Sequence, residues 1–378
     1  MIYLDHAATS WPKPPAVLAA MSAAMADVGG NPGRSGHRMA MRAGEIVYEC
    51  RESLARLFHI ADPLRIAFTA NATEALNLAI KGLLQPGDHV VFSSMEHNAV
   101  WRPLNAMAAR GVDLTVAEAG ADGIVPPQAI ADALRPGTKL VVLTHASNVN
   151  GALNDVATVG AIARAHGALF LVDAAQTAGC VPIDVDRMNI DLLAFPGHKG
   201  LLGPQGTGGL YIRAGLTLAP MKEGGTGSLS HLPTVPEFAP DRYESGTPNT
   251  PGVAGLNAGV KHLLACGVEN VRQHEMELCE RLRRGLEPLP GIRLFGPHDA
   301  IKRTGIVSLV ADGWDCEELA AVLDQDFDLA CRAGLACAFL AHRTQGTDAT
   351  GTLRLSLGVS STREDIDAAV AALRALLR

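Results

Sequence analysis

One lysine stands where its amine could do covalent chemistry. In the stretch FPGHKGLLGPQG, residues 195–206, Lys199 follows an apolar run and His198 at the mouth of a glycine-rich turn. If that run is a strand, the amine reaches the carboxyl edge of a sheet, where open α/β folds bind their ligands. There it could condense with an aldehyde cofactor to form a Schiff base. The competing interpretation is a solvated loop lysine beside turn glycines.

A carboxylate and a helix start supply two groups that such a cofactor needs. Asp173 ends the apolar run LFLVD, and a carboxylate there can keep a pyridine nitrogen protonated if the cofactor is pyridoxal phosphate. The stretch FTANATEALNLAI, residues 68–80, predicts a strand, a small-residue turn and a helix that begins near Thr73. Backbone N–H groups at a helix start and the Thr73 hydroxyl favour phosphate. The alternatives are a helix N-cap role for Asp173 and an ordinary capped helix after the turn.

An arginine near the end of the chain could recognise a substrate. Arg354 lies in TLRLSL, residues 352–357, which we interpret as a strand. Its guanidinium offers a planar fork that matches an α-carboxylate, so it could hold an amino acid if the strand faces the cleft. A surface arginine at a sheet edge is the alternative.

Alternating strands and helices must position these groups. The helical patterns end at Gly or Pro and span residues 73–84, 98–111, 126–137 and 155–167. Strands that alternate with helices in this way predict an α/β fold whose sheet is largely parallel and flanked by helices. The β-rich runs are residues 65–70, 88–94, 112–119, 138–145, 168–175, 190–195 and 207–213.

Composition shifts divide the rest of the chain. Residues 220–250 are dense in Gly, Pro, Ser and Thr and predict a long irregular segment of the kind that is functional or disordered. A long helical region follows over about 252–287, and PLPG at 288–291 precedes a second set of elements. In that set we predict strands at 304–311, 328–334 and 352–357, a helix at 315–326, and a terminal helix capped by Ser361 or Thr362.

The length of the chain favours two domains, because single cores stop growing at roughly 250 to 300 residues and this chain has 378. We predict a large domain over residues 15–255 and connecting helices over 256–290. A smaller C-terminal α/β domain would span 291–378 and include the N-terminal segment 1–14.

Charge and cysteine usage exclude several classes of protein. A net charge of −7 with no basic block predicts no nucleic-acid and no membrane partner. The opening MIYLDHAATSW lacks the basic and apolar regions of a signal peptide, so we expect a cytoplasmic protein. The seven cysteines are scattered without metal-ligand spacing, which predicts free thiols and no metal site.

Taken in order, the motifs of the chain resemble those of a known family. They run from YLDHAAT at 3–9 through TEALN, EHNA, HASNVNG, VDAAQ, GHKG and ESGTPNT to RAGLACA at 332–338 and RLSLG at 354–358. The chain is similar almost end to end to class V aminotransferases, and within them to the cysteine desulfurase and selenocysteine lyase group. The resemblance implies the fold type I architecture of pyridoxal-phosphate enzymes and pyridoxal 5'-phosphate as the cofactor.

The resemblance also implies which residues contact that cofactor. Lys199 would form the Schiff base, and Asp173 would hold the ring nitrogen. The other matching residues would surround the ring and phosphate: His97 stacked on the ring, Asn148 and Gln176 near its phenolic oxygen, Ala72, Thr73 and His198 at the phosphate, and Thr247 at the phosphate of a neighbouring subunit. The role of Thr247 implies a homodimer with composite active sites.

A cysteine nucleophile follows from the same resemblance. Cys337 has the Arg-x-Gly-x-x-Cys spacing in which family members use the cysteine as the sulfur acceptor. Its thiolate would attack the sulfur of a cofactor-bound cysteine and become a persulfide. Because the thiolate is the reactive form, we expect a cation such as Arg332 or His342 to increase its ionised fraction. Cys331, inside the predicted strand, is expected to be a buried structural thiol.

Two positions depart from the family pattern. Many desulfurases of this group carry a second histidine before the catalytic cysteine, where this chain has Ala336, so a proton relay through that position is absent. Pro196 stands where a small hydroxyl residue is common, which removes a phosphate donor and is expected to lower cofactor affinity. Neither departure touches Lys199, Asp173 or Arg354.

The resemblance therefore implies a cysteine desulfurase that converts L-cysteine to L-alanine and leaves a persulfide on Cys337. Arg354, Arg332 and Asn148 would bind the amino-acid substrate, and a sulfur-acceptor protein could be a further partner. Two enzymatic alternatives are a selenocysteine lyase and another class V aminotransferase or lyase that does not use Cys337. A non-catalytic scaffold homologue is the third.

Overall fold

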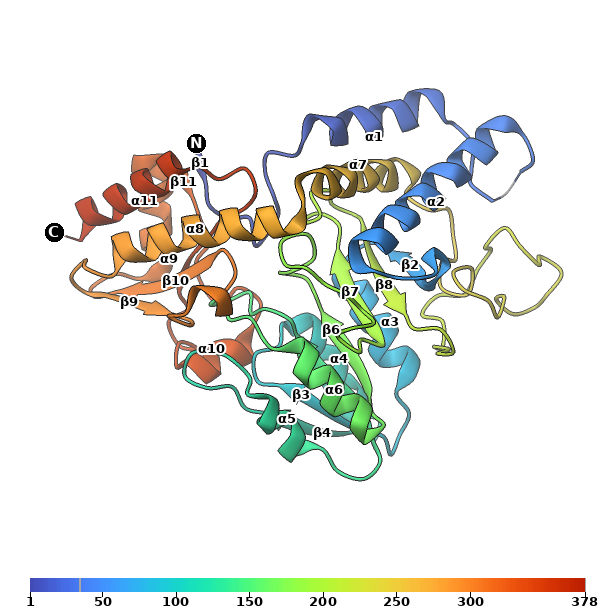
Figure 1. Cartoon of the computed structure of the whole chain (residues 1–378), viewed down its shortest axis with the longest axis horizontal. Helices are drawn as coiled ribbons and strands as arrows, with labels where there is room; N and C mark the ends of the chain where they lie inside the picture. The colour runs from blue at the N-terminus through green and yellow to red at the C-terminus, as the bar shows by residue number, and fades with distance from the viewer. Residues whose placement is uncertain (34, 378) are drawn as a thin grey trace.

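A seven-stranded sheet forms the larger part of the molecule (Figure 1), in a computed structural model that describes residues 1–33 and 35–377. The strand order is β2-β8-β7-β6-β5-β3-β4. These strands are β2 (Ile66–Thr69), β3 (His89–Ser93), β4 (Asp113–Ala117), β5 (Thr138–Thr144), β6 (Leu169–Asp173), β7 (Leu192–Pro196) and β8 (Gly208–Ile212). All the strands predicted between residues 65 and 213 are thus confirmed.

Parallel pairing brings the carboxyl ends of the central strands to one edge of this sheet. β3, β4, β5, β6 and β7 pair in parallel, whereas β8 runs antiparallel to its neighbours β7 and β2. All residues of β3 and β7 are buried, as expected for apolar strands covered on both faces. The prediction of a mostly parallel sheet is confirmed, with β8 as the exception.

Helices cover both faces of the sheet. Along β5, Leu140 and Val142 join one buried cluster while Val141 and Leu143 join another, because alternate residues of a strand point to opposite faces. The first cluster is completed by α3 (Ala72–Leu83) and α4 (Asn98–Ala108). The second is completed by α2 (Arg38–Phe58), α5 (Pro127–Ala133), α6 (Val156–His166) and α7 (Thr250–Cys266). The helices predicted between the strands are confirmed to within a few residues.

An irregular segment and two helices lead out of the large sheet. Residues 213–249 form no helix or strand, which confirms the irregular segment predicted over 220–250. The predicted long helical region is two helices, α7 and α8 (Val268–Leu286). They meet at Gly267, whose φ of +79° lies in the left-handed region that favours glycine.

A three-stranded antiparallel sheet forms the core of the C-terminal part. Its order is β12-β10-β9, and a separate two-stranded sheet pairs β1 with β11 in parallel. The elements of this part are β1 (Ile2–Tyr3), β9 (Ile292–Phe295), β10 (Ile306–Ala311), α9 (Cys316–Phe327), β11 (Leu329–Ala330), α10 (Phe339–Gln345), β12 (Leu353–Ser356) and α11 (Arg363–Leu376). Helix α11 is capped by Thr362, one of the two caps predicted.

The strand predicted over 328–334 is wrong in its extent. β11 ends at Ala330, and beyond it only an isolated bridge joins Arg332 to Arg354. Cys331 therefore lies outside the strand and is half-buried rather than buried. Burial still raises the pKa of its thiol to about 12, which fits the inert role expected for it. Helix α10 and strand β9 were not predicted.

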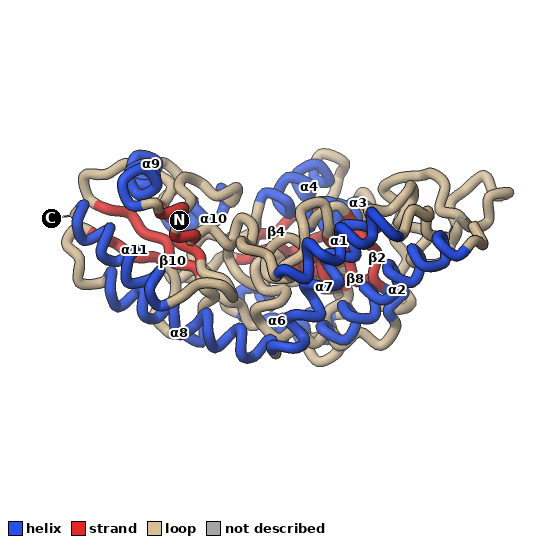
Figure 2. The backbone as a smooth tube through the Cα atoms, turned by 90° about the horizontal axis from the view of Figure 1, so that it is seen from above, coloured by secondary structure: helices blue, strands red, loops and turns tan. Residues whose placement is uncertain are grey.

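Two segments link the large and C-terminal parts. β1 lies in the C-terminal part and α1 (Pro15–Asp27) packs on α7, so the residues between them cross from one part to the other. Helix α8 packs on α7, α11 and β10, and Figure 2 shows it running along the C-terminal part to the edge of the large part. This arrangement supports the predicted division at 15–255, 256–290 and 291–378 with 1–14, which stays a prediction.

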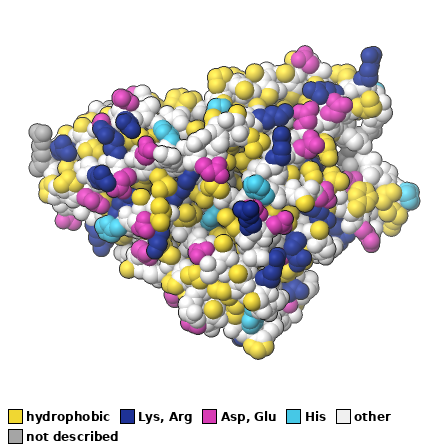
Figure 3. All heavy atoms as spheres, in the orientation of Figure 1, with side chains coloured by type: hydrophobic (Ala, Val, Ile, Leu, Met, Phe, Trp, Pro, Cys, Tyr) yellow, Lys and Arg dark blue, Asp and Glu magenta, His cyan; other side chains and the backbone are white. Residues whose placement is uncertain are grey.

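The surface carries charges of both signs. On the face in Figure 3, acidic and basic side chains are interspersed over the strands and helices rather than segregated. Within residues 1–33 and 35–377, no helix combines the length and apolar character needed to cross a lipid bilayer.

Candidate active site

The carboxyl ends of β6 and β7 open into a cleft that collects most of the predicted residues. It holds about 490 Å³ of space, part of which is open to solvent. The predicted residues that line it are Ala72, Thr73, His97, Asn148, Asp173, Gln176, His198 and Lys199. Of the residues predicted to contact the cofactor, only Thr247 lies elsewhere.

Asp173 is the last residue of β6 and pairs with Ala194 of the neighbouring strand β7. It is 3% exposed, and one carboxylate oxygen accepts a hydrogen bond from the Ala175 backbone N–H at 2.9 Å. No helix of the described residues begins at Asp173, so the N-cap interpretation is wrong. Burial raises the pKa of this carboxyl group, while the Ala175 hydrogen bond and Lys199 oppose that shift. A cation in the cleft would therefore stabilise its ionised form.

Lys199 lies in the turn that follows β7, as predicted. Part of its surface faces the cleft, but its amine is deep enough that burial lowers its pKa to about 8, with Asp173 opposing the shift. Arg354 and Arg332 lower that pKa further. A fraction of the amine is thus neutral near neutral pH and able to act as a nucleophile or base. A solvated loop lysine would not have this environment.

Helix α3 begins at the cleft. Its first residues, Ala72 and Thr73, line the cleft, and the Asn71 side chain caps the helix by accepting from the Glu74 N–H at 2.9 Å. The first N–H groups of a helix have no partner within it, so they can bind an anion. Burial lowers the pKa of His198 to about 4, so its ring is neutral and can donate one N–H. Pro196 also lines the cleft and offers no donor.

Three further predicted residues line the cleft and are fixed by hydrogen bonds. Nδ1 of His97 accepts from the Ala99 N–H at 3.0 Å, and burial lowers the pKa of His97 to about 4, so its ring is neutral. The Asn148 side chain donates to the Ala336 carbonyl at 2.7 Å. The Gln176 side chain donates to the Ala7 carbonyl at 3.1 Å.

Arg354 lies on β12 and is 2% exposed, so the surface interpretation is wrong. Nη2 lies 2.9 Å from a carboxylate oxygen of Asp5, and Nη1 donates to the Asn148 carbonyl at 3.0 Å. Nε is buried and has no hydrogen-bond partner within the described part of the chain. The guanidinium is thus fixed beside a cleft residue with donor capacity left for a carboxylate.

Cys337 is exposed on the loop between β11 and α10. Nη2 of Arg332 lies 3.4 Å from its sulfur, so the predicted cation is next to the predicted nucleophile. Ala336 and Cys337 have φ values of +46° and +59°, which non-glycine residues rarely adopt. The loop is fixed in this conformation because Asn98 N–H donates to the Cys337 carbonyl at 2.9 Å and Asn148 donates to the Ala336 carbonyl.

One candidate cation is wrong and one predicted contact lies away from the cleft. His342 is buried in α10, where its Nδ1 lies 2.8 Å from the Thr347 hydroxyl. Burial lowers its pKa to about 4, so it is neutral and cannot serve as the cation for Cys337. Thr247 lines a second cavity and accepts from the Asn31 side chain at 3.2 Å. Its predicted role across a subunit boundary stays a prediction.

Comparison with known proteins identifies the family. The family model "Aminotransferase class-V" matches residues 2–369. The chain belongs to the class V aminotransferase family. A probable cysteine desulfurase of Methanothermobacter thermautotrophicus is 36% identical over 371 residues, which cover 97% of this chain and 92% of that protein. A cysteine desulfurase of Pectobacterium carotovorum is 33% identical, with 90% of this chain and 85% of that protein covered.

Solved structures agree with this family assignment. The apo structure of a cysteine desulfurase from Thermococcus onnurineus matches with a TM-score of 0.93 and 32% identity, covering 100% of this chain and 94% of the other. A cysteine desulfurase from Escherichia coli matches with a TM-score of 0.89 and 31% identity, covering 99% and 94%. The predicted fold type I architecture is therefore confirmed.

The cleft of this class V family member fits pyridoxal phosphate. Asp173 is buried, and no Lys, Arg or His nitrogen of the described residues lies within 4.0 Å of its oxygens, so a protonated ring nitrogen would supply the missing cation. Lys199 offers an amine, and the start of α3 offers N–H groups for a phosphate. These three groups line one cleft, and they match three different parts of the same cofactor.

Sequence reasoning missed four N-terminal residues that support the site: Asp5, Thr9, Ser10 and Lys13. Asp5 and Thr9 belong to the motif YLDHAAT at 3–9, which the family resemblance included without assigning roles, whereas Ser10 and Lys13 lie beyond that motif and had no sequence signal. It also missed Glu96, whose buried carboxyl group accepts from the Ser93 hydroxyl at 2.6 Å and the Thr144 N–H at 2.7 Å.

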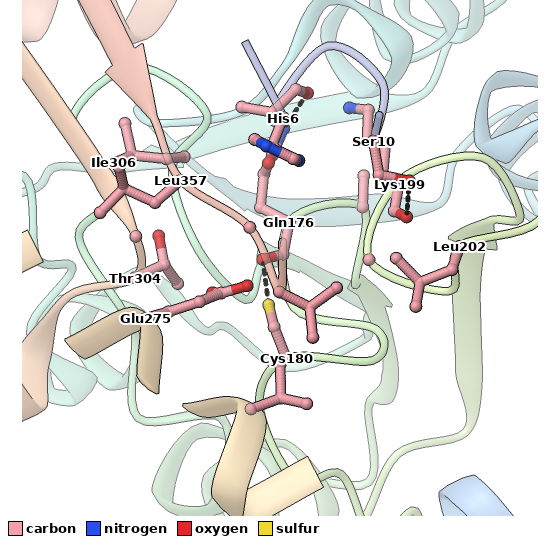
Figure 4. A pocket seen from close by; sticks show the side chains of 17 residues that line it. His6, Ser10, Gln176, Cys180, Lys199, Leu202, Glu275, Thr304, Ile306 and Leu357 are labelled. Atoms are coloured by element: carbon pink, nitrogen blue, oxygen red, sulfur yellow. Dashed lines mark hydrogen bonds between the residues drawn. The ribbon is translucent and has the colours of Figure 1, made fainter. Parts of the chain in front are cut away.

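A further cavity lies behind the cleft, between the large and C-terminal parts (Figure 4). Ala175, Gln176 and Lys199 line both hollows and therefore form the wall between them. Glu275 of α8 also faces this rear cavity, and burial raises the pKa of its carboxyl group to about 8. Lys199 thus lies between two hollows.

Proposed function

We propose that this protein is a cysteine desulfurase that binds pyridoxal 5'-phosphate and transfers the sulfur of L-cysteine to Cys337. The observation that carries the proposal is the joining of two sites by Asn148. That residue lines the Lys199–Asp173 cleft and also donates to the loop of the exposed thiol. The names of the relatives, cysteine desulfurase or probable cysteine desulfurase, support the same function.

The cofactor would be held at three points. When bound, pyridoxal phosphate supplies an electron sink next to the reacting carbon of the substrate. Lys199 would anchor it covalently, and Asp173 would keep its ring nitrogen protonated. Ala72, Thr73 and His198 would bind the phosphate through N–H and hydroxyl groups, and the neutral ring of His97 would stack on the cofactor. Asn148 and Gln176 would lie near the phenolic oxygen.

The substrate would be oriented by the arginines. Arg354 would bind the α-carboxylate, since its guanidinium is fixed by Asp5 and Asn148 and keeps its Nε–H free. Arg332 would bind near the substrate sulfur, beside Cys337. Lys199, once released from the cofactor, would carry protons to and from the substrate carbon, which its pKa of about 8 allows near neutral pH.

Sulfur transfer would occur at Cys337. The thiolate attacks the substrate sulfur, so that a sulfur–sulfur bond forms while the bond from that sulfur to the substrate β-carbon breaks. The electron pair of the broken bond stays with the carbon, which gains a proton and becomes the methyl group of alanine. One molecule of L-cysteine and the Cys337 thiol thus give alanine and a persulfide on Cys337, with no external oxidant or reductant.

The assembly is proposed to be a cytoplasmic homodimer. Exposed apolar side chains gather on the two helices nearest the N-terminus: Leu18 and Met25 on α1, and Met39, Met41 and Tyr48 on α2. Such surface is typical of a region that a second subunit covers. In the dimer, Thr247 would reach the phosphate in the partner's cleft, and a sulfur-acceptor protein would approach the exposed Cys337.

Product analysis tests the proposed function. Protein loaded with pyridoxal phosphate is mixed with L-cysteine, and alanine and sulfide are quantified with and without a thiol reductant. We expect alanine in both reactions, stoichiometric with persulfide when reductant is absent and with sulfide when it is present. The same assay with selenocysteine and Cys337→Ala separates a desulfurase from a selenocysteine lyase. Formation of pyruvate, or of no alanine from L-cysteine, would contradict the proposal.

A further inference from the structure

The chain between β1 and α1 contacts the turn that carries Lys199. We call residues Asp5–Lys13 the N-terminal strap. At its start, Asp5 pairs with Arg354, and the Ala7 N–H donates to the Ser356 hydroxyl at 2.9 Å. Its second half reaches the turn that carries Lys199. One short segment therefore contacts both Arg354 and the backbone around Lys199.

Hydrogen bonds from the strap meet on the backbone around Lys199. Lys13 Nζ donates to the His198 carbonyl at 2.7 Å, and it also donates to the Ser10 hydroxyl at 2.7 Å. That hydroxyl lies 2.9 Å from the Lys199 carbonyl and can donate to it, as the dashed line in Figure 4 shows. The His198 carbonyl also accepts from the Ser10 N–H and the Thr9 hydroxyl, each at 3.1 Å, and the Lys199 carbonyl accepts from the Leu202 N–H within the turn. Both carbonyls that flank the Lys199 Cα are therefore held by the strap, and Lys13 supplies its only charged donor to them.

The location of the Lys13 ammonium carries a desolvation cost. It is half-buried, and burial lowers its pKa to about 8. No carboxylate of the described residues lies within 4.0 Å of it, so only neutral oxygens compensate for its lost hydration. An apolar side chain would fill the same space without that desolvation cost. The ammonium is retained where it can form charge-assisted hydrogen bonds to the backbone of Lys199.

Lys199 needs such support because of its location. It lies in the wall shared by the cleft and the rear cavity, with empty space on two sides. A long side chain rooted in a mobile turn would spread over several positions, and misplacement of a catalytic group by about 1 Å can reduce rate by about 10²-fold. Fixing the two flanking peptide groups sets the direction in which the side chain leaves the backbone.

We propose that Lys13 is a positioning residue that orients Lys199 toward the cofactor through the His198 carbonyl and Ser10. The proposal rests on the proposed function only in taking Lys199 as the cofactor lysine. It predicts an effect on cofactor attachment and on turnover, but not on recognition of the substrate carboxylate, which Arg354 performs at the other end of the strap.

The test compares Lys13→Met with wild type and with Lys13→Arg. The first readout needs no amino acid: protein freed of cofactor is mixed with pyridoxal phosphate, and the rise of the visible absorption band is timed. We expect about tenfold slower attachment and about tenfold lower kcat in Lys13→Met, with KM for L-cysteine unchanged. Lys13→Arg should recover most of the rate, and Ser10→Ala should show a smaller loss. Exposed Lys139 supplies the matched control, Lys139→Met.

Three outcomes decide the proposal. A wild-type rate of attachment in folded Lys13→Met would overturn it. So would a fall in Tm that leaves attachment and kcat unchanged, because Lys13 would then be only structural. If Lys13→Met fails to fold, Ser10→Ala decides by the same measurements. Failure of the proposed function is distinguishable, since wild-type protein would then attach the cofactor without forming alanine from L-cysteine.

Discussion

The two ends of the active site are built from different kinds of structure. At the cofactor end, Asp173 and Lys199 come from the ends of buried parallel strands, and the neutral ring of His97 caps a helix. At the sulfur end, Cys337 is exposed on a loop whose backbone is held in a left-handed conformation. The first end partly desolvates its charged groups, whereas the second exposes its thiol.

This difference matches the chemistry proposed for each end. Acid–base groups gain from burial because desolvation moves their pKa values toward the working pH, as it does for Lys199. A thiol that must give its sulfur to another molecule has to remain accessible, so its activation must come from a neighbouring cation instead. Arg332 supplies that charge without covering the sulfur. The variants below test whether the two ends can be disabled separately.

The largest effect is expected for Lys199→Ala. Without this amine the cofactor cannot be anchored covalently, and no side chain remains to move protons at the substrate carbon. We expect the visible absorption band to be lost and alanine formation to fall by at least about 10⁴-fold. Spectroscopy and amino-acid analysis of the same preparation measure both. Retention of the band in Lys199→Ala would show that another lysine binds the cofactor.

Cys337→Ala should disable only the sulfur end. The side chain is exposed and its removal leaves no buried cavity, so fold, Tm and the visible band should remain as in wild type. Sulfide release from L-cysteine should fall by at least about 10³-fold, because no thiolate is left to take the sulfur. Sulfide assay and mass spectrometry for the persulfide check this.

The matched control for that variant is Cys331→Ala. Cys331 lies only six residues before Cys337 but has a pKa raised to about 12 by burial, so it should not act as a nucleophile. Desulfurase activity should therefore persist in Cys331→Ala. Activity that survives in Cys337→Ala and disappears in Cys331→Ala would show that Cys331 is the nucleophile. That result would contradict the assignment of an exposed thiol to the sulfur end.

The sequence predicted the cofactor end better than the sulfur end. Asp173 and Lys199 follow apolar runs, so strand periodicity alone indicated that both meet at one sheet edge. Cys337 has no such signal, because its loop conformation depends on Asn98 and Asn148, which are more than 180 residues away. His342 is only five residues after Cys337, so its position in the sequence suggested a cation. In the fold its side chain is buried within α10 beside Thr347.

The N-terminal strap could not have been predicted from local patterns either. Lys13 stands between two prolines, a context that indicates only an extended or turn conformation. Its acceptor is a backbone carbonyl 185 residues away, and every residue has such a carbonyl, so no residue type marks the contact. Contacts of side chains with distant backbone depend on tertiary packing and are invisible in a single sequence.

Arg332→Gln tests the charge at the sulfur end. The Arg332–Cys337 contact is partly exposed, and exposed charge pairs contribute up to about 1 kcal/mol, or about fivefold. We therefore expect iodoacetamide to alkylate Cys337 about two to five times more slowly at fixed pH, as measured by mass spectrometry of the peptide. Arg332→Lys should lie between the two. Unchanged alkylation in Arg332→Gln would mean that the loop conformation, rather than the cation, activates the thiol.

The smallest effect is expected for Glu96→Gln, and it concerns stability rather than turnover. Burial raises the pKa of Glu96 to about 8 from an unfolded value of about 4.5. Between these values the folded protein binds more protons than the unfolded chain, so stability falls as pH rises through that window. Glutamine can accept the same hydrogen bonds from Ser93 and Thr144 but cannot ionise.

Relative to wild type, Glu96→Gln should therefore lose less stability between pH 5 and 8, which appears as a smaller fall in Tm over that range. Thermal unfolding at several pH values measures this, and the exposed Glu277→Gln is the control because its charge is already solvated. A parallel pH dependence in Glu96→Gln and wild type would show that Glu96 is ionised in the folded protein. Burial would then not control ionisation at the cofactor end, and its contrast with the sulfur end would be one of geometry alone.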